Sequence, residues 1–310
     1  MIYFIVNETA KTGKGLNIWA KVKSILEEKH ISYHAVKTKY KNHATELARQ
    51  ISNRVKETGK EITLIVLGGD GTLNEVVNGI EDFGKVRIGL IPTGSGNDFA
   101  RGVGQKTSVE KSIDRVLNSQ EEELLDIGKV TYEGGDKPRY FAISSGIGMD
   151  AEVCKKAFTS KLKKILNKFH LGKLTYLLIT LQTLFSMKTE EIEVSFDEEE
   201  TNTYKRLVFT AAMNLRAEGG GVPMAPDADP ADGKLSMCMA HSLSRLTSVF
   251  VLPFLVMAKH GIFPCVKLVD FEACQLKLEE PMTLHADGEY LGEVSWAKYE
   301  CIPAVLRLIK

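Results

Sequence analysis

The stretch Ile62-Thr-Leu-Ile-Val-Leu67 runs directly into Gly68-Gly-Asp-Gly-Thr72, and Leu73–Asn78 then continues with helical character. A β-branched strand that passes through glycines into a helix is one unit of an α/β fold. The glycines let the backbone turn sharply with its N–H groups open, beside the positive end of the following helix. The segment therefore predicts a phosphate-binding loop, and a plain strand-to-helix turn capped by Asp70 or Thr72 is the alternative.

Short β-branched runs alternate with helical stretches through the first 125 residues. The expected elements are, in order, Ile2–Val6, Leu16–Lys29, Tyr33–Thr38, His43–Thr58, Ile62–Leu67, Thr72–Ile80, Arg87–Ile91 and Val109–Asn118. This alternation predicts a mostly parallel sheet covered by helices on both faces, which is a three-layer α/β domain. Ligands of such domains bind beyond the carboxyl ends of the strands.

After Asp126 the pattern changes to shorter runs of period two, separated by turn signals such as Gly219-Gly-Gly221 and Asp232-Gly233. The expected strands are Tyr140–Ser144, Glu191–Phe196, Leu207–Asn214, Leu235–Ala240, Val266–Phe271, Cys274–Leu278 and Met282–Ala286. They predict an antiparallel, sandwich-like domain over residues 126–294, interrupted by helices at about 151–187 and 244–260.

Composition excludes several classes of protein. The chain has 310 residues, with 40 Lys+Arg against 40 Asp+Glu, and this balance argues against a general nucleic-acid binder. Its five cysteines are scattered, so neither a disulfide framework nor a Cys/His zinc site is indicated. The N-terminus reads as a strand, and the apolar stretches Leu174–Met187 and Val249–Ala258 are shorter than the ~20 residues of a membrane span. We expect a soluble, cytoplasmic protein.

A second polar loop follows the next strand. Arg87–Ile91 leads into Pro92-Thr-Gly-Ser-Gly-Asn-Asp98, so two consecutive strands end in glycine-rich loops at one edge of the sheet. This loop and the start of the next helix offer two hydroxyls, an amide, a carboxylate and a cation, on Thr93, Ser95, Asn97, Asp98 and Arg101. Asp70 in the first loop could hold a water-bridged Mg²⁺ beside nucleotide phosphates. A third loop, residues 7–15, fits neither the Walker A nor the dinucleotide spacing.

Taken together, Gly68-Gly-Asp-Gly-Thr-Leu-Asn-Glu-Val-Val-Asn-Gly79 and Pro92–Arg101 resemble the catalytic domain of the diacylglycerol-kinase-type lipid kinases. The small bacterial members, which are related to sphingosine and ceramide kinases, are the most similar. The resemblance covers nearly the whole chain, because further motifs follow in the family's order: Ser145–Ala151, Gly219–Pro226, Asp232–Leu235 and Asp287-Gly-Glu289. The GGDGT loop alone is shared with NAD kinases, whereas the two long motifs together favour a lipid kinase.

The resemblance implies ATP and Mg²⁺ as cofactors and assigns residues to them. The cofactor-binding residues would be Asn7, Thr38, Gly68, Gly69, Asp70, Gly71, Thr72, Ser95 and Asn97. The family more often has Thr where Ser95 stands, and the hydroxyl is kept. Asp98 matches a carboxylate of the magnesium network, and Glu289 matches the proposed general base. From the residues alone, a hairpin turn at Asp287-Gly288 with Glu289 as its solvated neighbour is an equal alternative.

Two further implications concern the second half of the chain and its end. Family members carry a structural metal, which maps here to Asp229, Asp232 and the carbonyl of Lys234. Without the resemblance, residues 226–233 are a turn with acidic caps, and the spacing does not fit an EF-hand. The tail, residues 295–310, is expected to pack back on the first domain, as in related kinases.

The segment Lys155–Lys173 contains seven lysines and no acid, with apolar residues at helical spacing. It predicts a basic amphipathic helix that associates peripherally with an anionic membrane, and an ordinary helix packed on the second domain is the alternative. The acidic residues Glu190, Glu191, Glu193 and Asp197–Glu200 follow this segment and balance its positive charge.

We therefore expect an ATP-dependent lipid kinase that converts diacylglycerol to phosphatidic acid. The protein is expected to bind no nucleic acid, and a homodimer is one option for its assembly. The alternatives are an NAD-kinase-like enzyme and a non-catalytic lipid- or nucleotide-binding protein of the same fold.

Overall fold

The computed structural model describes residues 1–159 and 172–310, and leaves the side chains of residues 11, 12, 14 and 157–177 undescribed. The predicted basic helix over 155–173 thus lies largely outside the described residues. The chain divides into two compact units. The first comprises Met1–Ile127, Gly219–Gly221 and Ile302–Lys310, and the second comprises Gly128–Glu218 and Val222–Cys301.

The first unit is built on a parallel sheet. Its strands are β1 (Ile2–Val6), β2 (Tyr33–Lys37), β3 (Ile62–Gly68), β4 (Val86–Pro92) and the end of β14 (Glu289–Ile309). They lie in the order β14-β4-β3-β1-β2, and every neighbouring pair is parallel. The carboxyl ends of β3 and β4 therefore meet at one edge, where Gly68 pairs with Pro92.

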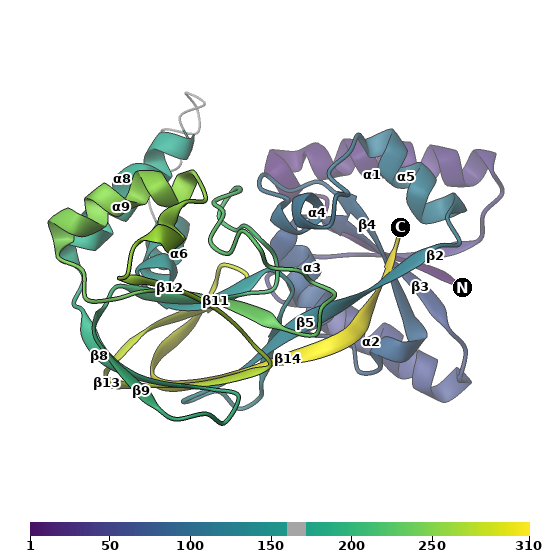
Figure 1. Ribbon diagram of the computed structural model, residues 1–310. Helices are drawn as coiled ribbons and strands as arrows, with labels where there is room; N and C mark the ends of the chain where they lie inside the picture. The colour runs from purple at the N-terminus through teal and green to yellow at the C-terminus, as the bar shows by residue number, and fades with distance from the viewer. Residues whose placement is uncertain (160–171) are drawn as a thin grey trace. The chain divides into compact units, whose positions relative to one another are not determined.

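Helices cover both faces of this sheet (Figure 1). They are α1 (Ala10–Glu28), α2 (His43–Thr58), α3 (Asp70–Val77), α4 (Asp98–Gly102) and α5 (Val109–Asn118), with a 3₁₀ turn at Phe83–Lys85. Trp19 and Leu26 of α1 share one buried cluster with Ile113 of α5 and Phe4 of β1, so these two helices pack on the same face. In Figure 1, α2 and α3 lie on the opposite face. The predicted three-layer α/β architecture is confirmed.

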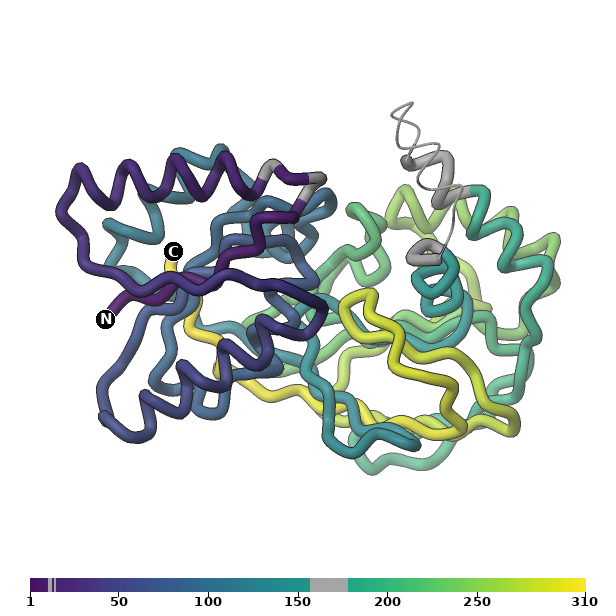
Figure 2. Tube along the Cα trace, turned by 180° about the vertical axis from the view of Figure 1, so that it is seen from behind, coloured from purple at the N-terminus to yellow at the C-terminus, as the bar shows by residue number. Residues whose placement is uncertain are grey.

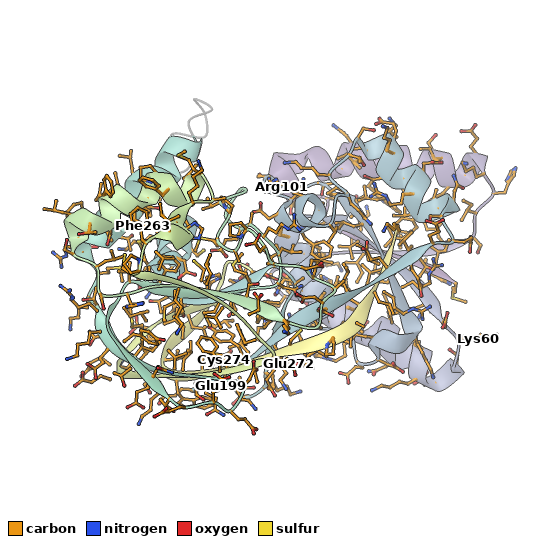
Figure 3. All side chains as sticks on the ribbon, viewed as in Figure 1. Lys60, Arg101, Glu199, Phe263, Glu272 and Cys274 are labelled. Atoms are coloured by element: carbon orange, nitrogen blue, oxygen red, sulfur yellow. The ribbon has the colours of Figure 1, made fainter. Side chains whose placement is uncertain are left out.

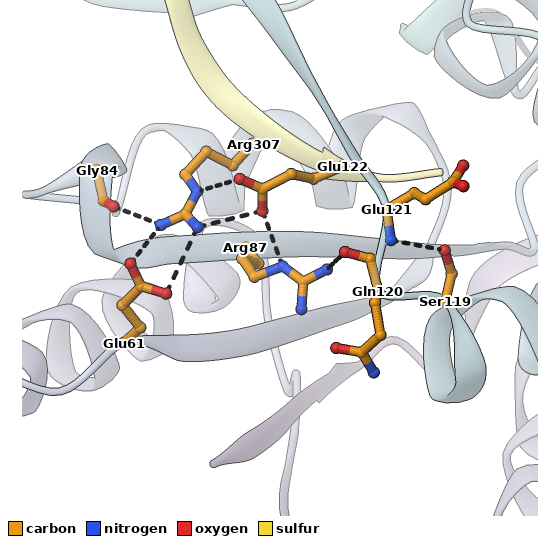
Figure 4. Close-up of polar contacts among 8 residues, drawn as sticks. All are labelled: Glu61, Gly84, Arg87, Ser119, Gln120, Glu121, Glu122 and Arg307. Carbon is orange, nitrogen blue, oxygen red and sulfur yellow. Dashed lines mark hydrogen bonds and ion pairs between the residues drawn. The ribbon is translucent and has the colours of Figure 1, made fainter.

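The last residues of the chain belong to the first unit, where β14 pairs with β4 and Arg307 adds side-chain contacts (Figure 4). Its guanidinium donates to Glu61 at 3.0 Å, to Glu122 at 3.0 Å and to the carbonyl of Gly84 at 2.6 Å. Glu122 in turn accepts from Arg87 of β4 at 2.9 Å. Figure 2 shows the C-terminus beside the strands of this unit, in the same unit as the N-terminus.

The second unit contains antiparallel strands. They are β6 (Arg139–Phe141), β7 (Ser144–Gly148), β8 (Glu190–Phe196), β9 (Asn202–Leu207), β10 (Phe209–Met213), β11 (Leu235–Ala240), β12 (Val266–Phe271) and β13 (Ala273–Ala286). The first part of β14 and the last part of β5 (Glu122–Tyr132) complete them. The order is β12-β11-β10-β7-β13-β14, while β8 and β9 extend from β13, and β5 pairs with β6 and β14. This architecture confirms the predicted sandwich-like domain.

The segments Cys274–Leu278 and Met282–Ala286 were expected as two strands and form one, β13. Its first half pairs with β8 and its last three residues pair with β7, with a register shift between Lys277 and Met282. The interruption in the period-two pattern is this irregularity, because a bulge breaks the alternation without ending a strand.

Among its described residues, the second unit has three longer helices: α6 (Met149–Thr159), α8 (Gly172–Ser186) and α9 (Arg245–Val256), with a 3₁₀ turn at His260–Ile262. In the part of the chain that the structure describes, no helix is long and apolar enough to span a bilayer.

Candidate active site

The two glycine-rich loops pack backbone against backbone at the edge of the parallel sheet. A Cβ on Gly94 would lie 2.7 Å from the Cα of Gly69, and a Cβ on Gly69 would lie 2.9 Å from the Cα of Gly94. The N–H of Thr93 donates to the carbonyl of Gly68 at 2.8 Å. Glycine is required at these two positions because any side chain would separate the loops.

Asp70 joins the first loop to the helix after the second. Its Oδ2 accepts from the N–H of Asp98 at 3.0 Å and its Oδ1 accepts from the N–H of Phe99 at 3.1 Å. The first N–H groups of any helix lack partners inside that helix, and a carboxylate satisfies them well. Asp70 therefore caps α4, which is not the helix that it begins.

Asp98 is buried and bonded on both carboxylate oxygens. Its Oδ1 pairs with the guanidinium of Arg101, and its Oδ2 accepts from the N–H of Gly220 at 2.8 Å. Arg101 also donates to the carbonyl of Gly96 at 2.9 Å. The same pair of charges thus holds the second loop and brings Gly219–Gly221 into the first unit.

Asn7 follows β1 and faces the first loop. Its Nδ2 donates to the hydroxyl of Thr72 at 3.0 Å, and its Oδ1 accepts from the hydroxyl of Thr9 at 2.8 Å. Thr38, just past β2, donates its N–H to the carbonyl of Val6 at 2.9 Å. These residues sit at the carboxyl ends of three neighbouring strands, where a nucleotide binds in such sheets.

The second loop contains polar atoms that suit a phosphate group. The buried hydroxyl of Thr93 and the buried Oδ1 of Asn97 have no hydrogen-bond partner among the described residues. Ser95 between them is exposed. Buried polar groups are normally paired, so a ligand with hydrogen-bonding oxygens fits here. Gly71 and Thr72 in the first turn of α3 add the positive end of a helix. The residues present therefore fit ATP phosphates, with the carboxylates of Asp70 and Asp98 adjacent for Mg²⁺ and its waters.

Glu289 lies in the second unit, directly after a tight turn. Asp287 and Gly288 both have positive φ, 46° and 80°, and Ala286 pairs with Glu289, which defines a two-residue hairpin. The carboxylate of Asp287 accepts from three consecutive N–H groups just before and at the start of β7, on Ala142, Ile143 and Ser144, at 2.8–3.0 Å. The turn that carries Glu289 is therefore anchored on β7 through Asp287.

His285 provides a second anchor for the same turn. It is 1% exposed, its Nδ1 accepts from the N–H of Gly288 at 3.1 Å, and its Nε2 lies 2.9 Å from Asp150 Oδ2. Burial of the ring lowers the pKa of His285, but the charge and hydrogen bond of Asp150, with Glu218 and Asp287 nearby, raise it to about 8. Ligand atoms of Asp150, Glu218 and His285 lie within 4.8 Å of one another, a spacing that a metal ion could use.

The predicted structural metal residues lie on the exposed loop between β10 and β11. Asp229 Oδ1 accepts from the N–H of Ala231 at 3.1 Å, and Asp232 Oδ1 accepts from the N–H of Lys234 at 2.9 Å. Both aspartates thus cap turns of their own loop, as expected for residues 226–233 without the family resemblance. Oxygen atoms such as these carboxylates and the carbonyl of Lys234 are the ligand type that a hard cation prefers.

Sequence reasoning missed the residues that support the site. It did not single out His285 or Asp150, and it treated Gly219–Gly221 as a turn signal. The one available signal was the position of Asp150 and of Gly219–Gly221 inside the motifs Ser145–Ala151 and Gly219–Pro226, and His285 lies in neither motif. Periodicity does not show contacts between residues far apart in the chain.

Comparison with known proteins agrees with this geometry. The family described as "Diacylglycerol kinase catalytic domain" matches residues 1–130, and the family described as "YegS C-terminal NAD kinase beta sandwich-like domain" matches residues 143–310. YtlR of Bacillus subtilis (strain 168), whose name provisionally assigns it as a lipid kinase, is 29% identical over 308 residues, covering 99% of this chain and 98% of that protein. A diacylglycerol kinase of the same strain is 30% identical over 254 residues, covering 81% of this chain and 79% of that protein.

A crystal structure from Bacillus anthracis str. Sterne, provisionally named a diacylglycerol kinase, has the same fold. Its TM-score is 0.74 at 22% identity, and the match covers 99% of this chain and 96% of that chain. The resemblance seen in the two loop motifs is thus confirmed over both halves of the chain. The chain belongs to the diacylglycerol-kinase-type family of lipid kinases.

Proposed function

We propose that this protein transfers the γ-phosphate of ATP to the hydroxyl of diacylglycerol, which gives phosphatidic acid. The observation that carries the proposal is the close backbone packing of the two glycine-rich loops after β3 and β4. Asp70 and Asp98 hold the loops together, and the unpartnered Thr93 hydroxyl lies among them. Phosphoryl transfer depends mainly on positioning and electrostatic stabilisation, and such a rigid edge supplies both.

The nucleotide-binding residues would be Asn7, Thr38, Gly68, Gly69, Gly71, Thr72, Ser95 and Asn97, all in the first unit. The carboxylates of Asp70 and Asp98 would hold Mg²⁺ through its waters. When bound, Mg²⁺ neutralises phosphate charge. Asp229, Asp232 and the carbonyl of Lys234 would hold a separate structural cation.

Glu289 would act as the general base. It would accept the proton of the lipid hydroxyl as that oxygen forms a bond to the γ-phosphorus, while the bond from the γ-phosphorus to the bridging oxygen breaks and ADP leaves. The turn anchored by Asp287 and His285 fixes the backbone on which this carboxylate is carried.

The preference for a lipid acceptor over NAD rests on the relatives, which are named as a lipid kinase and a diacylglycerol kinase. An apolar cavity in the second unit, lined by side chains that include Leu184, Phe209 and Leu255, has a volume of about 30 Å³. It is too small for an acyl chain.

The test is transfer of labelled phosphate from ATP to a panel of lipid alcohols in mixed micelles, with an NAD arm, with and without Mg²⁺. We expect labelled phosphatidic acid from diacylglycerol only when Mg²⁺ is present. Labelled NADP without any labelled lipid would assign the chain to NAD phosphorylation, and no turnover with any acceptor would assign a binding role.

The base is tested with Glu289→Gln, and Glu280→Gln, at an exposed position of β13, serves as the matched control. We expect Glu289→Gln to lower kcat by about 10²–10⁴-fold while ATP affinity is retained. A fully active Glu289→Gln would refute the base assignment.

A further inference from the structure

Helix α9 exposes apolar side chains along its outer side. Its inner side buries Ser248, Val251 and Leu255. The large apolar residues on its other side and in the turn after it are 58–77% exposed: Leu246, Phe250, Val256, Met257 and Ile262. We call these five residues the α9 surface. Contiguous apolar groups of this kind mark interaction sites, because single exposed apolar residues are the rule elsewhere.

An aromatic cluster holds this surface rigid. The ring of Phe254 lies 5.5 Å from that of Phe250 and 4.9 Å from that of Phe263, and Phe250 and Phe263 are 6.2 Å apart. Phe263 is labelled beside α9 in Figure 3. Phe250 is therefore exposed to solvent while its ring packs against those of Phe254 and Phe263.

Helix α8 extends the apolar area. It contacts α9, and the two helices lie side by side in Figure 1. Leu178 and Phe185 of α8 are also exposed, seven residues apart and so on one side of the helix. Both helices line the apolar cavity with Leu184, Val251 and Leu255, so the same elements separate that cavity from the outer surface.

The segment that carries the α9 surface has charges of one sign only. No Asp or Glu occurs from Gly233 to Val269, although the chain contains 40 acidic residues. Arg245 at the start of α9 and Lys259 after its end are exposed, and neither forms an ion pair with another described residue. An apolar side bounded by cations at both ends complements anionic headgroups above hydrocarbon.

We propose that the α9 surface docks the protein on an anionic bilayer. The five apolar side chains enter the boundary between headgroups and acyl chains, and Arg245 and Lys259 bind lipid phosphates. At 12 residues, α9 lies in the interface and does not cross it. The role of this docking in catalysis rests on the proposed lipid kinase activity, but the docking itself does not.

The first experiment measures cosedimentation of the full chain with vesicles of phosphatidylcholine, alone or mixed with phosphatidylglycerol. We expect binding to the mixed vesicles. The double variant Phe250→Ser/Met257→Ser should bind them about tenfold or more weakly, because two apolar anchors are lost. Arg245→Gln/Lys259→Gln should lose the preference for phosphatidylglycerol. Leu124→Ser, which removes an exposed apolar residue of β5, should bind like the wild type.

Unchanged binding of Phe250→Ser/Met257→Ser would overturn the proposal. So would a wild-type dimer that this variant dissociates in the absence of vesicles, because the surface would then contact a second copy. A Phe250→Trp variant gives an independent reading: its emission should shift to the blue when mixed vesicles are added, and an unshifted spectrum contradicts insertion. Thermal melting monitors folding of each variant.

Activity separates this inference from the proposed function. The double variant should lose activity on diacylglycerol in vesicles and keep it on a short-chain, monomeric diacylglycerol. Equal loss on both substrates would contradict a docking role. A wild-type chain that binds vesicles without phosphorylating any lipid would refute the kinase proposal and leave docking intact.

Discussion

The carboxylate of Asp98 accepts a hydrogen bond from the backbone N–H of Gly220 at 2.8 Å, although 122 residues separate the two. Gly219–Gly221 belongs to the first unit, while the residues on either side belong to the second. Asp98 therefore organises two distant glycine segments with one side chain.

Asp98→Asn should lower both stability and ATP affinity. The amide cannot balance the charge of Arg101, and it leaves one carboxylate contact unmade. We expect a loss of about 1–3 kcal/mol in the free energy of unfolding, measured by urea denaturation. Asp114→Asn, on the exposed side of α5, should leave both unchanged. Full stability of Asp98→Asn would contradict this account of the pair.

Gly94→Ala should weaken nucleotide binding. The new Cβ would meet the Cα of Gly69 at 2.7 Å, and neither backbone can yield without separating the loops. We expect ATP affinity, measured by titration calorimetry, to fall about tenfold or more, which corresponds to about 1.4 kcal/mol. Gly84→Ala is the control, because its Cβ meets only Asp82 Oδ1 at 3.4 Å.

His285 should make stability depend on pH. Its pKa is about 8 in the folded protein, above the ~6.5 of an unfolded chain. The contribution is therefore fully present below about pH 6.5 and is lost as the pH rises through about 8. The difference in unfolding free energy between wild type and His285→Asn should shrink over that range. Asp150→Asn should abolish the same dependence, and a difference that is constant with pH would contradict the pair.

Arg307→Ala should destabilise the first unit. The guanidinium bonds Glu61, Glu122 and the carbonyl of Gly84, so its loss frees the end of β14 (Figure 4). We expect about 1–3 kcal/mol, since these hydrogen bonds involve charged groups, with faster amide exchange at Leu308 and Ile309. Lys310→Ala removes only an exposed pair with Glu123 and should change the unfolding free energy by less than about 0.5 kcal/mol.

The fold class followed from the sequence because periodicity is local. Alternating strand and helix patterns up to about residue 125 and period-two runs afterwards each reflect which side of an element faces a core. The prediction of two separate strands within β13 was wrong, because a bulge and a loop interrupt the alternation of apolar and polar residues in the same way.

The sequence by itself determined that glycine-rich polar loops end β3 and β4, since glycine spacing and strand ends are properties of neighbouring residues. Only the tertiary structure decided what the polar side chains hold. Asp70 caps α4, Asp98 reaches Gly220, and His285 bonds Gly288 and Asp150. The α9 surface was equally hidden, because a helix pattern shows that residues are apolar but not which of them packing leaves uncovered. Such contacts join positions far apart in the chain, and they form only when sheet register and helix packing bring those positions together.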